Sequence, residues 1–470
     1  MVISDMIKAA VESFKHELEG LSEEAEQDLS PALAERVTRG LQEGASAACR
    51  EAFRVFIEKK ETVAERVEVD GEVFGFKYSS TKDVLTLWGK VAIARRVYQN
   101  ASDTRTVVPL DRAWGMEKEY LTMEVRESVG FALAHMPPVE AMQFFRKCVS
   151  SYRPHATQMK KAAAEIAQRV REGEAALKAR LPEHEPVPEG SRALVASLDG
   201  ANVLMREAGA AKRGRPAERP GLGRTQSDDT AYRNAMVGVV SFYGEVKENA
   251  QTPQRLSSVY TSHMPEPLAP TFKRKFEAEV KAAQDKAPPE VVKVVLCDGA
   301  RALWKYIRAT PLFQGYRQIF DYYHAAEHLS LAAQALFGKG TQEARDWFEK
   351  YAHKLLEEDG AVDALVRSMK YHAKTRGLTA ARRRDLKTQR GYFLDNKAYM
   401  AYADYRRQGL PIGSGPVEAA CKTLVKARLC QSGMRWKAEG GQNILDLRTY
   451  LKSKRWEPMW ETYKERSNAA

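Results

Sequence analysis

Three acidic residues occupy settings that suit metal-ion chemistry. Asp199 follows the apolar run 193–198, Asp298 follows the apolar run 291–297, and Glu418 comes two residues after a proline. We expect both aspartates at the ends of buried strands and Glu418 in the first turn of a helix, so that all three converge at one sheet edge. Carboxylate oxygens are ligands for Mg²⁺, and two such ions would support phosphodiester cleavage and joining. Asp199 would bridge the two ions, and the other two acids would each complete one.

Each of these acids also has an ordinary explanation. Asp199 and Asp298 both precede glycine, which is typical of a turn-forming aspartate. Glu418 follows Pro416, and an acidic residue in a first helical turn needs no metal to explain it. The chemical hypothesis therefore rests on the three residues taken together.

The elements around these acids predict a catalytic core of α/β class. Apolar and alternating runs predict strands, and two amphipathic stretches at about 267–286 and 300–310 predict helices between them. The expected strands are 193–198, 202–205, 234–244, 291–297 and 316–320. Three strands followed by alternating helices and strands is the order of an RNase H-like fold with a mixed five-stranded sheet. We place its first part at 190–320, an all-helical insertion at 321–410, and its last helix with the C-terminal region at 411–470.

The residues before this core predict smaller modules that could bind DNA. Residues 1–62 have helical periodicity, with a new helix starting at Pro31, and residues 63–115 predict a small β unit with turns at 70–71 and 89–90. Residues 116–185 predict three helices, the second short and the third long, as in a helix-turn-helix. On that hypothesis the third helix would present Gln158, Lys160 and Lys161 to DNA. An ordinary helical bundle explains the same pattern.

The amino-acid composition limits the classes of protein to which this chain can belong. The 470 residues carry 74 Lys and Arg against 62 Asp and Glu, a net charge of +12, and residues 1–70 are acidic, so the remainder is more basic still. Such a balance favours a polyanionic partner, although a merely soluble basic protein would show it too. Five scattered cysteines without a CxxC pair argue against a disulfide framework. We expect neither a signal peptide nor a membrane span, and a cytoplasmic location.

Several motifs together carry a family resemblance. They are SLDG at 197–200, LCDGA at 296–300, DYYHAAEH at 321–328, GSGPVEAACK at 413–422 and SGMRW at 432–436. In this order and spacing they resemble the DDE transposases of bacterial insertion sequences, and most closely the ISKra-type group, which is related to Mutator-like elements. The similarity covers about residues 63–460. It implies an RNase H-like core, a helical insertion, two Mg²⁺ or Mn²⁺ ions, and a catalytic triad of Asp199, Asp298 and Glu418.

The resemblance also implies an activity and partners. A transposase of this kind binds the terminal inverted repeats of its element, cleaves the element end with water and joins the released 3′-OH to target DNA. It acts as a homodimer or higher oligomer on DNA, here in the bacterial cytoplasm at the nucleoid. Relatives carry cysteine pairs near the β unit that suggest a structural zinc, whereas this chain has no cysteine between Cys49 and Cys148. An RNase H-like structure-specific nuclease and a non-mobile DNA-binding descendant are the alternatives.

The segment at 321–328 supports two different interpretations. Asp321 and His324 match a motif of Mutator-like relatives, in which an Asp or Cys precedes a His by three residues. On a helix these two side chains share a face, so they could point at the DNA or the active site, or instead order the insertion. His324, Glu327 and His328 also fit the HxxEH pattern of zinc metalloproteases, which is a less favoured hypothesis.

Basic and aromatic residues after Glu418 are candidates for DNA contacts. The expected set beside the site is Lys422, Lys426, Arg428, Arg435, Trp436 and Lys437. Lysine and arginine would contact phosphates, and Trp436 could stack on an unpaired base or serve as a core residue. A Gly-, Pro- and Arg-rich stretch adds Lys212, Arg213 and Arg215, which could contact DNA or form a plain charged loop.

Overall fold

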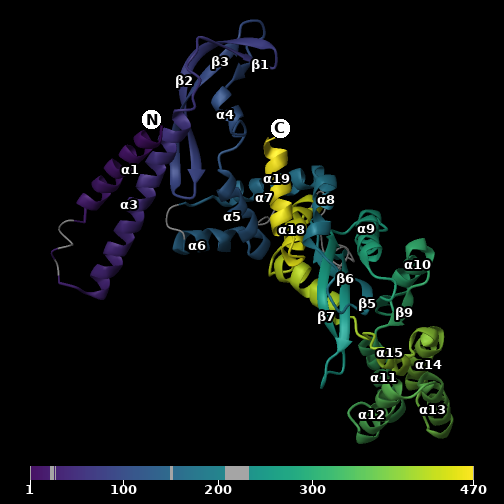
Figure 1. Cartoon of the computed structure of the whole chain (residues 1–470). Coiled ribbons are helices and arrows are strands. Elements are labelled where there is room, and N and C mark those ends of the chain that lie inside the picture. The colour runs from purple at the N-terminus through teal and green to yellow at the C-terminus, as the bar shows by residue number, and fades with distance from the viewer. Residues whose placement is uncertain (1, 22–25, 27, 149–151, 207–231, 469–470) are drawn as a thin grey trace, which may run out of the picture. The chain divides into compact units, whose positions relative to one another are not determined.

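The computed structural model describes residues 2–21, 26, 28–148, 152–206 and 232–468. Two compact units are present. The first comprises residues 1–181 and 456–470, and the second comprises residues 182–455 (Figure 1). Each unit is described by itself below.

The first unit begins with two long helices and a small sheet. Helix α3 starts at Pro31, where the Ser30 hydroxyl accepts a hydrogen bond from Leu33 N at 3.1 Å, as expected for a proline-led helix start. Asp70 and Gly71 have φ angles of 55° and 80° and form the turn between the first two strands. The elements are α1 (Val2–Glu19), α3 (Pro31–Glu58), and an antiparallel sheet of β1 (Arg66–Val69), β2 (Glu72–Thr86), β3 (Gly89–Asn100) and β4 (Thr106–Val107).

Helices complete the first unit around a buried arginine. The Arg126 guanidinium donates to Leu121 O at 2.8 Å and to Tyr463 Oη at 3.0 Å, so residues far apart in sequence share one hydrogen-bond network. Helices α5 and α19 both pack against α7. The helices are α4 (Pro109–Ala113), α5 (Met123–His135), α6 (Pro138–Cys148), α7 (Ala156–Glu172), α8 (Glu174–His184, which crosses the unit boundary) and α19 (Trp456–Asn468).

The second unit is built on a mixed five-stranded sheet with the order β7-β6-β5-β8-β9. Strands β7, β6 and β5 pair antiparallel, whereas β8 and β9 run parallel to β5. The strands are β5 (Ala193–Leu204), β6 (Tyr232–Val246), β7 (Pro253–His263), β8 (Val292–Cys297) and β9 (Arg317–Phe320). The expectation of a mixed five-stranded α/β sheet is confirmed.

Two of the expected strands differ from the observed ones. Residues 193–198 and 202–205 are one continuous strand, β5, because β6 pairs with it without interruption from Ala193 to Leu204. The remaining strand is β7, at the edge of the sheet, which was not among the expected strands and whose residues do not alternate regularly in burial. The number of strands was therefore right, while the assignment of two of them was wrong.

Helices cover the sheet. On one face, α9 (Pro270–Lys286) lies so close to β6 that a Cβ on Gly238 would come 2.8 Å from Cε2 of the buried Phe276 ring. Helix α10 (Arg301–Ala309) contributes Trp304 to the same hydrophobic core. After the insertion, α16 (Gly415–Ala420) and a π-helix (Cys421–Lys426) pack against β5. Helix α17 (Ala427–Leu429) continues from the π-helix, and α18 (Ala438–Lys452) packs against β7.

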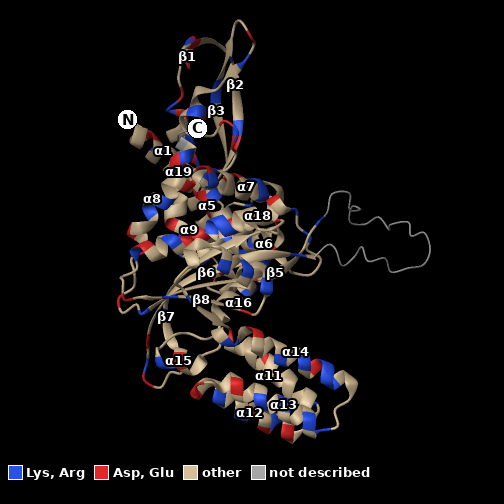
Figure 2. Ribbon diagram, turned by 90° about the vertical axis from the view of Figure 1, so that its right-hand side faces the viewer, with Lys and Arg blue, Asp and Glu red and all other residues tan. Residues whose placement is uncertain are grey.

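Residues 321–410, predicted to be a helical insertion and called the insertion below, contain helices and no strand. Helices α11 to α14 gather into a bundle beside the sheet in both views (Figures 1 and 2). Their apolar residues join the core of the sheet, since Leu329 and Phe393 belong to the same cluster as Val195. The helices are α11 (Tyr322–Phe337), α12 (Gln342–Glu357), α13 (Ala361–Thr375), α14 (Ala380–Asn396) and α15 (Tyr402–Arg407).

Length and hydropathy together rule out a transmembrane candidate among the helices that the structure describes.

Substitution of Gly238 by alanine tests the packing of α9 on the sheet. The new Cβ would collide with Phe276, which is fully buried and stacked on Phe272 at 5.7 Å between ring centroids. We expect Gly238→Ala to lower the free energy of unfolding by about 1–3 kcal/mol, measured by chemical denaturation. Gly391→Ala is the matched control, because no heavy atom lies within 4 Å of its Cβ position. Equal stability of the Gly238 variant and the wild type would contradict the close contact.

Candidate active site

The sheet brings Asp199 and Asp298 together. Strands β5 and β8 pair in parallel from Ala193 with Val292 to Ala196 with Val295. Asp199 and Asp298 each follow the last of these pairs by three residues, and the Asp199 carboxylate is close enough to raise the pKa of Asp298. Asp199 itself lies inside β5, where its pairing with β6 continues, and not at the strand end as predicted. The parallel pairing with β8 ends three residues before Asp199, at Ala196, and the two aspartates lie close together just beyond it.

Asp298 lies in an electrostatically unfavourable position beside Asp199. Burial raises the pKa of Asp298, and the neighbouring carboxylates of Asp199 and Asp321 raise it further. A hydrogen bond from Ala300 N to Asp298 Oδ1 at 3.0 Å and the nearby His324 oppose this rise in the pKa of Asp298. Half-buried like charges at this position favour a bound cation or a proton.

Glu418 lies on the helix that packs over Asp199. Ser414 precedes α16 and Pro416 is in its first turn, as expected. The Glu418 side chain is exposed, and its Oε1 lies 3.2 Å from Ser414 Oγ. Three residues later, Cys421 Sγ contacts Asp199 Oδ2 at 3.6 Å. Cys421 therefore joins the helix of Glu418 to the strand of Asp199.

The side chains of the candidate site do not by themselves form a complete set of metal ligands. Among the residues that the structure describes, no three His, Cys, Asp or Glu side chains are grouped closely enough to hold a metal ion. The aspartate pair nevertheless fits Mg²⁺, which commonly takes one or two protein carboxylates and fills its octahedron with water and phosphate oxygens. Glu418 would have to turn inward from its contact with Ser414 to add a third carboxylate.

Asp321 has a structural position between three segments. It is 1% exposed and begins α11, where its Oδ1 accepts a hydrogen bond from His324 N at 2.6 Å. Its Oδ2 accepts from Ser414 N, and its own N donates to Cys297 O at 2.9 Å. This geometry supports the ordering of the insertion by Asp321, whose charge also raises the pKa of Asp298 in the candidate site.

The two histidines of the HxxEH pattern have separate partners. His324 Nδ1 lies 3.3 Å from Glu327 Oε2, whereas His328 Nδ1 lies 2.6 Å from Gln389 Oε1. Their rings are perpendicular, with centroids 5.0 Å apart. Burial is the main cause that lowers the pKa of His328. Within the pattern, His328 joins α11 to α14 through its contact with Gln389.

The candidate DNA contacts after Glu418 divide into exposed and buried residues. Lys422, Lys426, Arg435 and Lys437 are exposed, as a phosphate contact requires. Arg428 is 1% exposed, and its guanidinium carbon lies 5.7 Å from the centre of the Trp436 ring. The expected phosphate contact of Arg428 therefore does not agree with its burial.

Trp436 is bound to the end of β5. Its N donates to Leu204 O at 3.0 Å, its O accepts from Arg206 N at 2.8 Å, and its indole Nε1 donates to Leu429 O at 2.9 Å. These bonds support a structural role for Trp436. The remaining candidates Lys212, Arg213 and Arg215 lie outside the described residues.

The candidate recognition helix is α7. Gln158 Oε1 accepts a hydrogen bond from His155 N at 2.9 Å, which satisfies a donor at the helix start. Lys161 Nζ donates to Lys118 O at 3.1 Å, and Lys160 is exposed. Two of the three expected DNA contacts thus have partners within the protein, and the helix-turn-helix stays a prediction.

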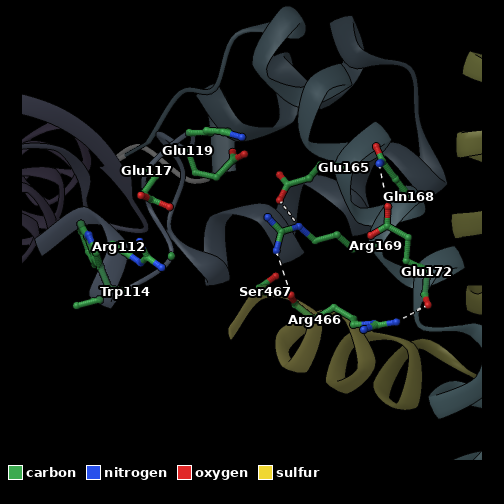
Figure 3. Close-up of a pocket in the computed structure, with 13 residues that line it drawn as sticks. Arg112, Trp114, Glu117, Glu119, Glu165, Gln168, Arg169, Glu172, Arg466 and Ser467 are labelled. Carbon is green, nitrogen blue, oxygen red and sulfur yellow. Dashed lines mark hydrogen bonds and ion pairs between the residues drawn. The ribbon is translucent and has the colours of Figure 1, made fainter. Parts of the chain in front are cut away.

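A cavity of about 1210 Å³ lies in the first unit (Figure 3). Charged side chains of both signs line it, and several are paired along its wall. Arg169 Nε lies 2.9 Å from Glu165 Oε1, and Arg466 Nη2 donates to Glu172 O at 2.6 Å. This mixed and internally paired lining does not define one class of ligand.

Tyr392 and Gly299 lie beside Asp298 but were not among the residues predicted for the site. Tyr392 lies on α14, yet its ring would contact a Cβ placed on Gly299, directly after Asp298. The glycine in the sequence Asp298-Gly299 was attributed to a turn. The signal that could have found it is the need for space beside Asp298, but the residue that occupies this space is nearly 100 positions away.

Comparison of the chain with models of protein families and with curated proteins gives no match.

Removal of the Asp321 carboxylate tests its bridging role. Asp321→Ala leaves two amide donors without their acceptor, so we expect the free energy of unfolding to fall by about 1–3 kcal/mol. We also expect faster hydrogen exchange at the Ser414 and His324 amides, followed by mass spectrometry or NMR. The exposed Asp385 on α14 provides the control substitution Asp385→Ala. Unchanged exchange at Ser414 in the Asp321 variant would argue against the bridge.

Proposed function

We propose that this protein is a metal-dependent DNA transposase of the DDE type, with Asp199, Asp298 and Glu418 as its acidic triad. The observation that carries the proposal is the closeness of Asp199 and Asp298, which each follow the last parallel pair of β5 and β8 by three residues and interact electrostatically. The packing of the Glu418 helix on Asp199 through Cys421 supports the third member. The motifs that resemble insertion-sequence transposases supply the reaction class.

The sheet supports an RNase H-like assignment of the catalytic core. Three consecutive antiparallel strands are followed by two strands parallel to the first, and the first strand is central. A helical insertion separates the last parallel strand from the helix that carries Glu418. This order of elements is the one that the resemblance implies.

Each part of the site has a role in the proposed reaction. The two aspartates would hold Mg²⁺ or Mn²⁺, which when bound activates the attacking oxygen and stabilises the leaving one. Lys422 and Lys426, exposed on the π-helix after Glu418, would bind backbone phosphates and orient the DNA end. The substrates would be terminal inverted repeats and target DNA, bound by a homodimer or higher oligomer.

Neutral variants of the triad test the proposal. We expect Asp199→Asn, Asp298→Asn and Glu418→Gln each to lower the rate of Mn²⁺-dependent cleavage of DNA carrying the element ends by at least about 100-fold, since each removes a preorganised charged group. Glu349→Gln, an exposed residue of α12, is the matched control. Full cleavage by all three variants would refute the proposed site. Cleavage by the wild type without joining to target DNA would instead support a structure-specific nuclease.

The basic residues of the π-helix provide a second test. We expect Lys422→Ala together with Lys426→Ala to weaken DNA binding and to reduce the slope of log K against log salt concentration by about 2, since two phosphate contacts are lost. Fluorescence anisotropy at several salt concentrations measures both. The double substitution Arg383→Ala and Arg384→Ala, at exposed positions of α14, controls for total charge. Identical slopes for the lysine variant and the wild type would remove these residues from the DNA interface.

A further inference from the structure

Tyr392 connects the helical insertion to the backbone beside Asp298. A Cβ placed on Gly299 would lie 2.8 Å from Tyr392 Cε2 and 3.2 Å from its hydroxyl oxygen. The edge of the tyrosine ring therefore rests on the glycine that follows Asp298. Any larger residue at position 299 would displace the ring.

Other residues of the insertion hold this ring in place. The His328 ring stacks on Tyr392 with a centroid separation of 3.6 Å and an interplanar angle of 15°. Gln389 fixes His328 through the 2.6 Å contact between Oε1 and Nδ1. His324 packs edge-on against Tyr392 at 6.0 Å. Three side chains of α11 and α14 thus orient Tyr392 toward the end of β8.

The Tyr392 hydroxyl is a buried donor without a hydrogen-bond partner in the described part of the molecule. A buried donor without a partner lowers the stability of the fold. Phenylalanine would fill the same space between His328 and Gly299 without this cost. Packing between His328 and Gly299 explains an aromatic ring at position 392, but it gives no reason for the hydroxyl group.

The neighbouring carboxylates identify an acceptor for this hydroxyl. Burial raises the pKa of Tyr392, and the charges of Asp321 and Asp298 add to the rise, so the hydroxyl keeps its proton. Both Asp321 oxygens already accept backbone amides, from His324 and Ser414. Asp298 accepts the Ala300 amide at Oδ1, and its other oxygen has no partner among the described residues.

We propose that Tyr392 is a positioning residue for Asp298, whose free carboxylate oxygen accepts the Tyr392 hydroxyl when a divalent cation occupies the other side. This inference rests on the proposed function, because it takes Asp298 to be a metal ligand. A hydrogen bond from outside fixes the orientation of a ligating carboxylate, and its loss commonly lowers metal affinity by about 10–100-fold. The helical insertion thereby contributes to the metal site without supplying a ligand.

Titration of the full-length protein with Mn²⁺ tests this role. We expect Tyr392→Phe to weaken Mn²⁺ binding by about 10–100-fold, measured by calorimetry or by the EPR signal of free Mn²⁺, with no loss of thermal stability. Tyr371→Phe, an exposed tyrosine of α13, is the matched control and should bind as the wild type does. Equal Mn²⁺ affinity of Tyr392→Phe and the wild type would overturn the inference.

Asp298→Asn in the same titration separates this inference from the proposed function. If Asp298→Asn weakens Mn²⁺ binding and Tyr392→Phe does not, the role of Tyr392 fails and the metal site stands. If Asp298→Asn binds like the wild type, both fail. In DNA cleavage, Tyr392→Phe should raise the Mn²⁺ concentration required for half-maximal rate and leave the rate at saturating Mn²⁺ unchanged. A fall in the saturating rate alone would contradict a role through metal affinity.

Discussion

One buried carboxylate holds the parts of the candidate site together. Asp321 accepts amides from the start of α11 and from Ser414, and its own amide binds the last carbonyl of β8. The strand before Asp298, the first turn of the insertion and the loop before Glu418 are thereby fixed to one another. A buried charge is tolerated there because backbone donors satisfy it. The position of Asp298 relative to the helix of Glu418 therefore depends on this junction.

Local sequence signals predicted the parts of the fold that local forces decide. The Ser30-Pro31 helix start, the Asp70-Gly71 turn and the run ending at Cys297 were all recognisable, since capping, left-handed backbone conformation and burial are properties of short segments. The predicted break at Asp199 failed because long-range pairing with β6 outweighs the turn preference of Asp-Gly.

The approach of Asp199 to Asp298 was predicted only as convergence at a sheet edge, and the parallel register of β5 and β8 up to Ala196 and Val295 explains it. Sequence alone could not distinguish a surface arginine from the buried Arg428, or a stacking tryptophan from Trp436, whose bonds reach back to Leu204 and Arg206. The position of Trp436 depends on contacts with residues more than 200 positions away, and Arg428 lies against that ring. Tyr392 was not predicted because its contact with Gly299 is also far apart in the sequence.

The contact between Gly299 and Tyr392 limits the independent exchange of the insertion and the core. The insertion has its own helices, as does a structural unit that can be replaced or deleted without affecting the core. Its tyrosine, however, fills space that the core leaves open beside Asp298. A related core with a larger residue at position 299 would not accept this insertion, and this core joined to another insertion would carry a gap. Core and insertion are therefore expected to change together during divergence.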